Sequence, residues 1–194
     1  EEKGPFIMKK IKRIIIPLLA ILCIPLFLAG CGSKEAFAAS AQNKNGEIWY
    51  TVSGNTVDAI FYVHNNNLTA YDIGNHKLSF FAGKSNSEVL SEAKKIASKQ
   101  SDSTTSGTFT SKIVTDDNSK VLKEKICFKD SSDGEDSFTL INPNAQIKVG
   151  NDKYFGYNIK EDGTKGKLIS NSGKQVAFDN DKTNNVEQVN QEND

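Results

Sequence analysis

Residues 47–73 read EIWYTVSGNTVDAIFYVHNNNLTAYDI, and this stretch decides the fold. Three runs within it, 47–52, 57–63 and 68–73, are rich in β-branched and aromatic residues, which is typical of strands. A Ser-Gly-Asn triplet separates the first two runs, and an Asn-rich segment separates the last two. Both segments favour tight turns. The stretch therefore predicts three neighbouring strands of an antiparallel sheet.

One helix is expected after these strands, over residues 86–99. Ser85 with Glu88, or Ser87 alone, can cap its first turn. Its apolar residues recur at helical spacing and define one buried face, namely Val89, Ala93, Ile96 and Ala97.

Short strand signals occupy most of the remaining chain. We expect further strands at 77–81, 108–114, 121–128, 137–141, 146–149, 154–159, 167–170 and 175–178. Turns are expected at 142–144, which read Asn-Pro-Asn, and at 171–173. The fold class is therefore mainly β, or α+β, with antiparallel sheets forming a sandwich or a partial barrel over residues 46–178.

Composition excludes several classes of function. The chain has 24 basic and 24 acidic residues, and Arg13 is its only arginine. From Cys31 onward, 19 basic and 22 acidic residues give a net charge of −3. Beyond the leader the chain is mildly acidic and has no arginine to bind phosphates or bases in a bidentate manner. It is therefore not expected to bind nucleic acid. Three cysteines cannot build a disulfide scaffold.

The first thirty residues have the layout of a secretory signal. Four basic residues lie between positions 9 and 13, and residues 14–28 form an uncharged run of 15 residues. A helix that spans a bilayer needs about 20 apolar residues. This run is shorter and contains Pro17 and Pro25. A signal peptide over residues 8–30 is therefore favoured over a permanent anchor helix.

The end of this segment, Leu28-Ala29-Gly30-Cys31, resembles the lipobox of bacterial lipoproteins. The resemblance implies that the Cys31 thiol is joined to diacylglycerol and that a peptidase cuts between Gly30 and Cys31. Two acyl chains give stable anchoring, whereas one chain gives only marginal binding. The implied location is the outer face of the cytoplasmic membrane, with no cofactor besides this covalent diacylglycerol.

Both ends of the chain carry further expectations. Residues 1–7 place acidic charge ahead of the basic segment, and we expect translation to begin at Met8. Residues 31–45 are small and polar, which predicts a flexible tether. Residues 179–194 are acidic and rich in Asn and Gln, which predicts a disordered tail.

The aromatic residues suggest a binding face. Trp49, Tyr50, Tyr62 and Tyr71 lie on predicted strands, as do Tyr154 and Tyr157. If several share an exposed face, they can stack on wall sugars or on a peptide. Strand alternation places half of such residues inside, so packing in the core is the alternative and the default expectation.

Residues capable of catalysis or metal binding are few. Cys127 lies between Ile126 and Phe128 on a predicted strand, which favours a buried and inert thiol. His64 and His76 could join Asp72 around zinc, but they lack the spacing of known zinc motifs. We expect neither a metal site nor an enzyme.

Three functional hypotheses remain. The pattern of residues 46–170 resembles a loose group of small Gram-positive surface lipoproteins of unassigned function, which implies a non-enzymatic envelope module. That module would bind a cell-wall, peptide or protein partner. Alternatively, residues Ile24 to Gly30 of the leader resemble the apolar pheromones released from some lipoprotein leaders. The third hypothesis is a surface-exclusion or immunity lipoprotein.

Overall fold

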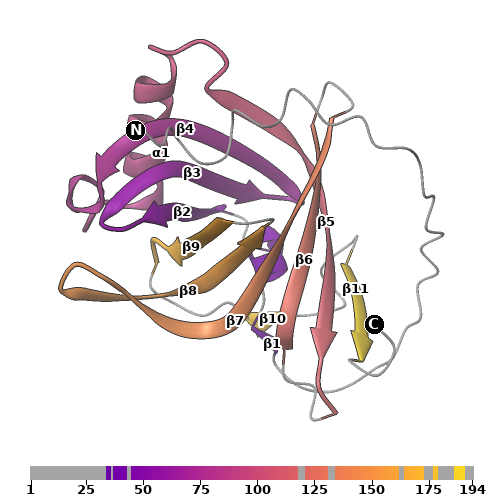
Figure 1. The fold of residues 1–194 in the computed structure, drawn as a ribbon. Helices are drawn as coiled ribbons and strands as arrows, with labels where there is room; N and C mark the ends of the chain where they lie inside the picture. Colours follow the sequence, from indigo (N-terminus) through magenta and orange to yellow (C-terminus); the bar gives the residue numbers. More distant parts are fainter. Residues whose placement is uncertain are drawn as a thin grey trace.

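The computed structural model describes residues 34–35, 37–42, 45–117, 121–130, 134–161, 164–172, 177–178 and 186–190. These residues are mostly β-structure (Figure 1). The strands are β1 (Lys34–Glu35), β2 (Glu47–Ser53), β3 (Thr56–His64), β4 (Asn67–Lys77), β5 (Thr104–Thr115), β6 (Val121–Asp130), β7 (Glu135–Val149), β8 (Asp152–Glu161), β9 (Thr164–Ser170), β10 (Ala177–Phe178) and β11 (Val186–Asn190). The helical elements are η1 (Phe37–Gln42), η2 (Leu78–Phe80) and α1 (Asn86–Ala97).

A closed antiparallel barrel forms the centre of the molecule. Each strand from β2 to β9 pairs with the next one along the chain, and β9 returns to pair with β2. The predicted antiparallel sheet is thus confirmed, and its form is a closed barrel, not a sandwich. Closure satisfies the backbone groups that an edge strand would leave exposed.

Both faces of β2 are covered, which explains its continuous burial. All residues from Glu47 to Val52 are buried. Trp49 faces the barrel interior and Tyr50 faces outward beneath α1, as the period of two in a strand requires. Each large side chain buried in this way contributes about 1.5–3 kcal/mol.

Two apolar clusters result from this arrangement. The interior cluster includes Phe37, Trp49, Phe61, Phe109, Ile126, Leu140, Tyr157 and Leu168. The outer cluster packs between the barrel wall and α1 and includes Ile48, Tyr50, Ile60, Tyr71, Phe81, Val89, Ala93 and Ile169.

The helix forms where the sequence predicts it. Ser85 and Glu88 make a capping box in which the Ser85 amide donates to the Glu88 carboxylate at 2.8 Å. Val89, Ala93 and Ala97 are buried against the barrel. No helix in the described part of the chain is long and apolar enough to cross a membrane.

Two local predictions are wrong. Residues 77–81 do not form a separate strand, because β4 continues to Lys77 and the turn η2 follows. Leu78 and Phe81 are both buried, at a spacing that one helical turn brings to the same side. The predicted turn at 142–144 instead lies within β7, at a register shift relative to β8. A bulge accommodates Pro143, which cannot donate to the ladder.

The chain ends also differ from the prediction. Residues 37–42 of the expected tether form η1, whose first five residues are buried. Residues 186–190 of the expected disordered tail form β11, which pairs in parallel with the end of β5. β4 pairs with β5 only as far as Thr108. The edge of β5 beyond Thr108 is therefore available to pair with β11. The predicted signal peptide, residues 8–30, and the predicted lipidation site Cys31 lie outside the described residues.

Candidate functional site

A buried carboxylate marks the most unusual position in the barrel. Glu124 lies on β6, where alternate residues Ile126 and Phe128 face the interior. Glu124 shares this inward orientation, and only 1% of its surface is exposed. A buried charge of this kind requires hydrogen-bond partners.

Those partners come mainly from η1, which we call the plug (residues 37–42). One oxygen of Glu124, Oε2, accepts a hydrogen bond from the Phe37 amide at 2.8 Å. The other oxygen, Oε1, accepts from the Ala38 amide at 2.8 Å and from the Ser111 hydroxyl at 2.6 Å. The first amides of a helical turn have no partner within the turn. Glu124 therefore satisfies two donors that would otherwise be buried without an acceptor.

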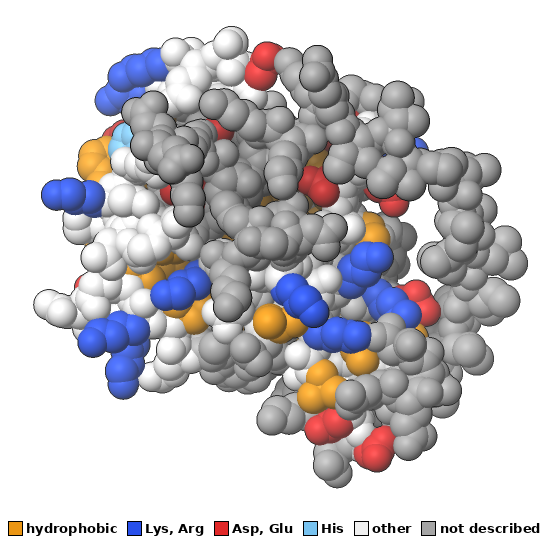
Figure 2. Space-filling model, viewed as in Figure 1, with side chains coloured by type: hydrophobic (Ala, Val, Ile, Leu, Met, Phe, Trp, Pro, Cys, Tyr) orange, Lys and Arg blue, Asp and Glu red, His pale blue; other side chains and the backbone are white. Residues whose placement is uncertain are grey.

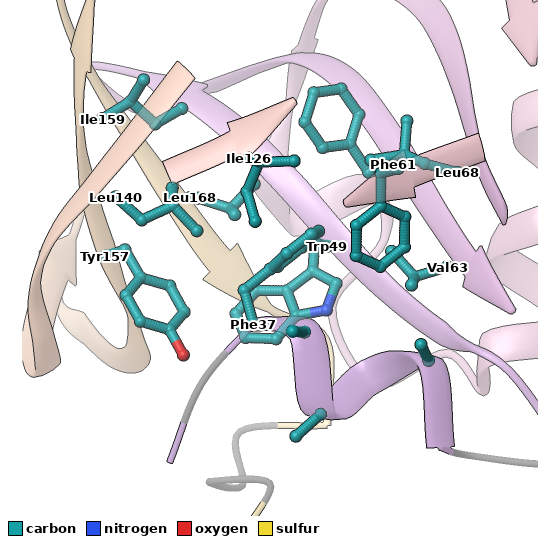
Figure 3. Packing of buried hydrophobic residues seen from close by; sticks show 14 of the residues in the cluster. Phe37, Trp49, Phe61, Val63, Leu68, Ile126, Leu140, Tyr157, Ile159 and Leu168 are labelled. Carbon is teal, nitrogen blue, oxygen red and sulfur yellow. The ribbon is translucent and has the colours of Figure 1, made fainter. Parts of the chain in front are cut away.

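Side chains of the plug complete its attachment to the barrel. The Trp49 indole Nε1–H donates to the Ser40 hydroxyl at 2.9 Å. The Phe37 ring lies 5.3 Å from the Trp49 ring and 5.9 Å from the Phe109 ring, between centroids. Figure 3 shows Phe37 beside Trp49 among the other interior side chains, with the coil of η1 below them. Ala38 and Ala39 are fully buried, and residues this small allow the turn to fit inside.

Burial controls the protonation of Glu124. Loss of hydration raises the pKa of this carboxyl above its ordinary value, and the bonds from Ser111, Ala38 and Phe37 lower it by less. The folded protein therefore binds this proton more tightly than the unfolded chain. The resulting stability is fully present below the ordinary pKa of 4.5 and is lost as pH rises through the raised value.

The interior of the barrel is a packed core. Barrels of eight strands either fill their interior with side chains or hold one small ligand. Here aromatic side chains and the plug occupy that space. Within the described ranges, no three His, Cys, Asp or Glu residues come close enough to hold a metal ion.

The four aromatics proposed as a binding face do not share one. Trp49 is in the interior cluster, whereas Tyr50 and Tyr71 are buried in the outer cluster. Tyr62 is half-buried and stacks on His64 at 6.0 Å between ring centroids. The alternative of core packing is confirmed for Trp49, Tyr50 and Tyr71.

The other candidate residues are also separated. His64 ends β3, whereas His76 pairs with Val57 near the beginning of that strand. The two positions on β3 are seven residues apart, which corresponds to roughly 20 Å of strand. The two histidines therefore cannot share a zinc ion with Asp72. Cys127 is half-buried and lies opposite Thr110 on the outer face of the barrel, not in the core.

A second unusual carboxylate lies on β3, at the position where the register between β3 and β4 shifts. Asp58 is buried, and its Oδ1 atom has no hydrogen-bond partner among the residues that the structure describes. Burial raises its pKa to about 6, and the nearby charge of Asp72 adds to this effect. Stability that depends on protonated Asp58 is therefore present below pH 4 and lost as pH rises through about 6.

Sequence reasoning missed Glu124 and the plug. The signal for Glu124 was its place in the alternation with Ile126 and Phe128, which assigns it to an inward face. Phe37 gave a weaker signal, as a single large apolar residue within a polar segment.

No protein-family pattern, curated protein or solved structure matches this chain.

We predict that Glu124→Gln weakens the attachment of the plug. The amide keeps the volume of the carboxylate, but its NH2 group opposes a buried donor, which costs about 1–3 kcal/mol. The loss should be largest below pH 4.5, where the stability from protonated Glu124 is fully present in the wild-type protein, and should shrink as pH rises. Urea unfolding followed by the fluorescence of Trp49 measures both effects. Exposed Glu135→Gln is the control, and an equal, pH-independent effect of both variants would contradict the role of Glu124.

We also predict that Asp58→Asn stabilises the protein at pH 8, by on the order of 1 kcal/mol, and gives no gain at pH 4. The asparagine amide has nearly the same volume as the carboxylate but carries no charge. The substitution therefore removes a buried charge that lies near the like charge of Asp72. Urea unfolding at the two pH values tests this, with exposed Asp152→Asn as the control. An Asp58→Asn protein no more stable than wild type at pH 8 would contradict the prediction.

Proposed function

We propose that this protein is a lipoprotein held on the outer face of the cytoplasmic membrane, where its barrel acts as a non-enzymatic binding module. The observation that carries the proposal is the leader. A basic segment, an uncharged run of 15 residues and Leu28-Ala29-Gly30-Cys31 follow one another in the order that lipoprotein processing requires.

The position of the plug supports a short connection between lipid and barrel. Cys31 lies six residues before Phe37, whose amide donates to Glu124 inside the barrel. Six residues of extended chain span at most about 22 Å. A diacylglycerol group on Cys31 would therefore hold the barrel close to the bilayer, instead of on a long flexible tether.

The packed interior favours a partner that binds outside the barrel. Trp49, Phe61 and the plug fill the space in which a small ligand would otherwise lie. The recognition surface then consists of outward residues of the strands and loops. Such a surface suits a protein, a peptide or a polymer of the envelope better than a small enclosed ligand.

Substitution of the proposed lipidation site tests the anchor. We predict that Cys31→Ala gives an uncut precursor without fatty acid, because alanine has no thiol to form the thioether. Whole-protein mass spectrometry and metabolic labelling with a radioactive fatty acid measure both changes. Cys23→Ala is the matched control, since this cysteine lies within the leader and should leave processing intact. A Cys31→Ala protein that still carries lipid would refute the proposal.

A further inference from the structure

The outer surface of the barrel carries two adjacent rows of residues that are rich in lysine. In the first row, Lys112 on β5 lies opposite Lys125 on β6, followed by Thr139 on β7 and Lys160 on β8. In the second row, Val114 is followed by Lys123, Ile141, Asn158 and Lys167 on successive strands. We call the five lysines of these rows the lysine face: Lys112, Lys123, Lys125, Lys160 and Lys167.

Alternation along the strands directs these lysines away from the core. Their neighbours Ile113, Glu124, Ile159 and Leu168 are all buried, whereas Lys125 and Lys160 are exposed. In Figure 2, lysine side chains gather over β5 and β6, with hydrophobic side chains between them.

The charge of this face contrasts with that of the chain as a whole. Neither row contains an acidic residue, and Glu187 of β11 lies at the margin, opposite Lys112. The chain is net acidic beyond its leader, so this local excess of lysine is unusual. An anionic surface would attract its exposed members, Lys125 and Lys160.

The lysine face also lies close to the proposed anchor. Glu124 separates Lys123 from Lys125 on β6 and binds the Phe37 amide on the inner side of the same strand. Cys31 lies only six residues before Phe37. A lipid on Cys31 would therefore enter the bilayer near the strand that displays these lysines, within about 22 Å of chain.

We propose that the lysine face lies against the anionic headgroups of the bilayer to which Cys31 is anchored, an inference that rests on the proposed function. Lysine suits this role, because its ammonium group is a compact point charge that needs no defined phosphate geometry. A cluster of lysines near a membrane is attracted to an anionic leaflet, over a distance that becomes shorter as the salt concentration rises. The contact orients the barrel, so that the surfaces away from the lysine face point toward the wall.

Protection of individual lysines tests this orientation. The purified, processed protein is inserted into vesicles of phosphatidylcholine alone or mixed with anionic phosphatidylglycerol. The lysines are then acetylated, and the extent of acetylation at each lysine is measured over time by peptide mass spectrometry. We expect Lys125 and Lys160 to react at least about fivefold more slowly on anionic vesicles, and high salt to abolish the difference. Exposed Lys94 and Lys95 on α1 are the internal controls and should react equally on both vesicles.

The outcomes separate the two proposals. If the mass of the purified protein, measured before vesicles are added, shows no fatty acid, the proposed lipid anchor on Cys31 is contradicted. Equal acetylation of Lys125 on neutral and anionic vesicles, in a protein that does carry lipid, overturns the lysine face alone. Protection by an anionic polyol-phosphate wall polymer but not by vesicles would likewise overturn the membrane contact and assign the face to the wall.

Discussion

The structure depends on one buried interaction, between the Glu124 carboxylate and the first amides of the plug. Two backbone donors from residues 37 and 38 and the Ser111 hydroxyl converge on its two oxygens. Without the plug, the carboxylate would lose two of its three donors inside an apolar barrel. Without the carboxylate, the plug would bury two amides that have no acceptor. Each therefore requires the other, and the pair joins the N-terminal segment to the barrel.

Local sequence patterns were sufficient for much of the fold. The strands of residues 47–73 and the helix with its Ser85–Glu88 capping box were predictable, because composition, turns and caps act over a few residues. Barrel closure was not predictable in this way. It depends on the pairing of Trp49 with Ser170, two residues that lie far apart in the chain. The bulge at residues 142–144 was missed because Asn-Pro-Asn is also typical of a turn.

The candidate site was harder to predict, because its partners lie 86 and 87 residues apart. A glutamate between two lysines on a strand is normally assigned to the solvent face. The segment around Phe37 has the composition of a tether, and only the barrel gives it a place to pack. The alternation of side chains along β6 also explains the outer surface, because Lys123 and Lys125 point outward where Glu124 points inward. One strand thus connects the plug, the proposed anchor and the lysine face.

Amide hydrogen exchange at Phe37 and Ala38 tests the central claim most directly. If these amides donate to Glu124 inside the barrel, they should exchange only when the core opens, at rates similar to those of buried β6 amides such as that of Ile126. In Glu124→Gln protein their exchange should accelerate more than that of Ile126. If the two amides exchange in the wild-type protein at the rate of an unstructured peptide, the segment is a tether, and the plug and its coupling to Glu124 do not exist.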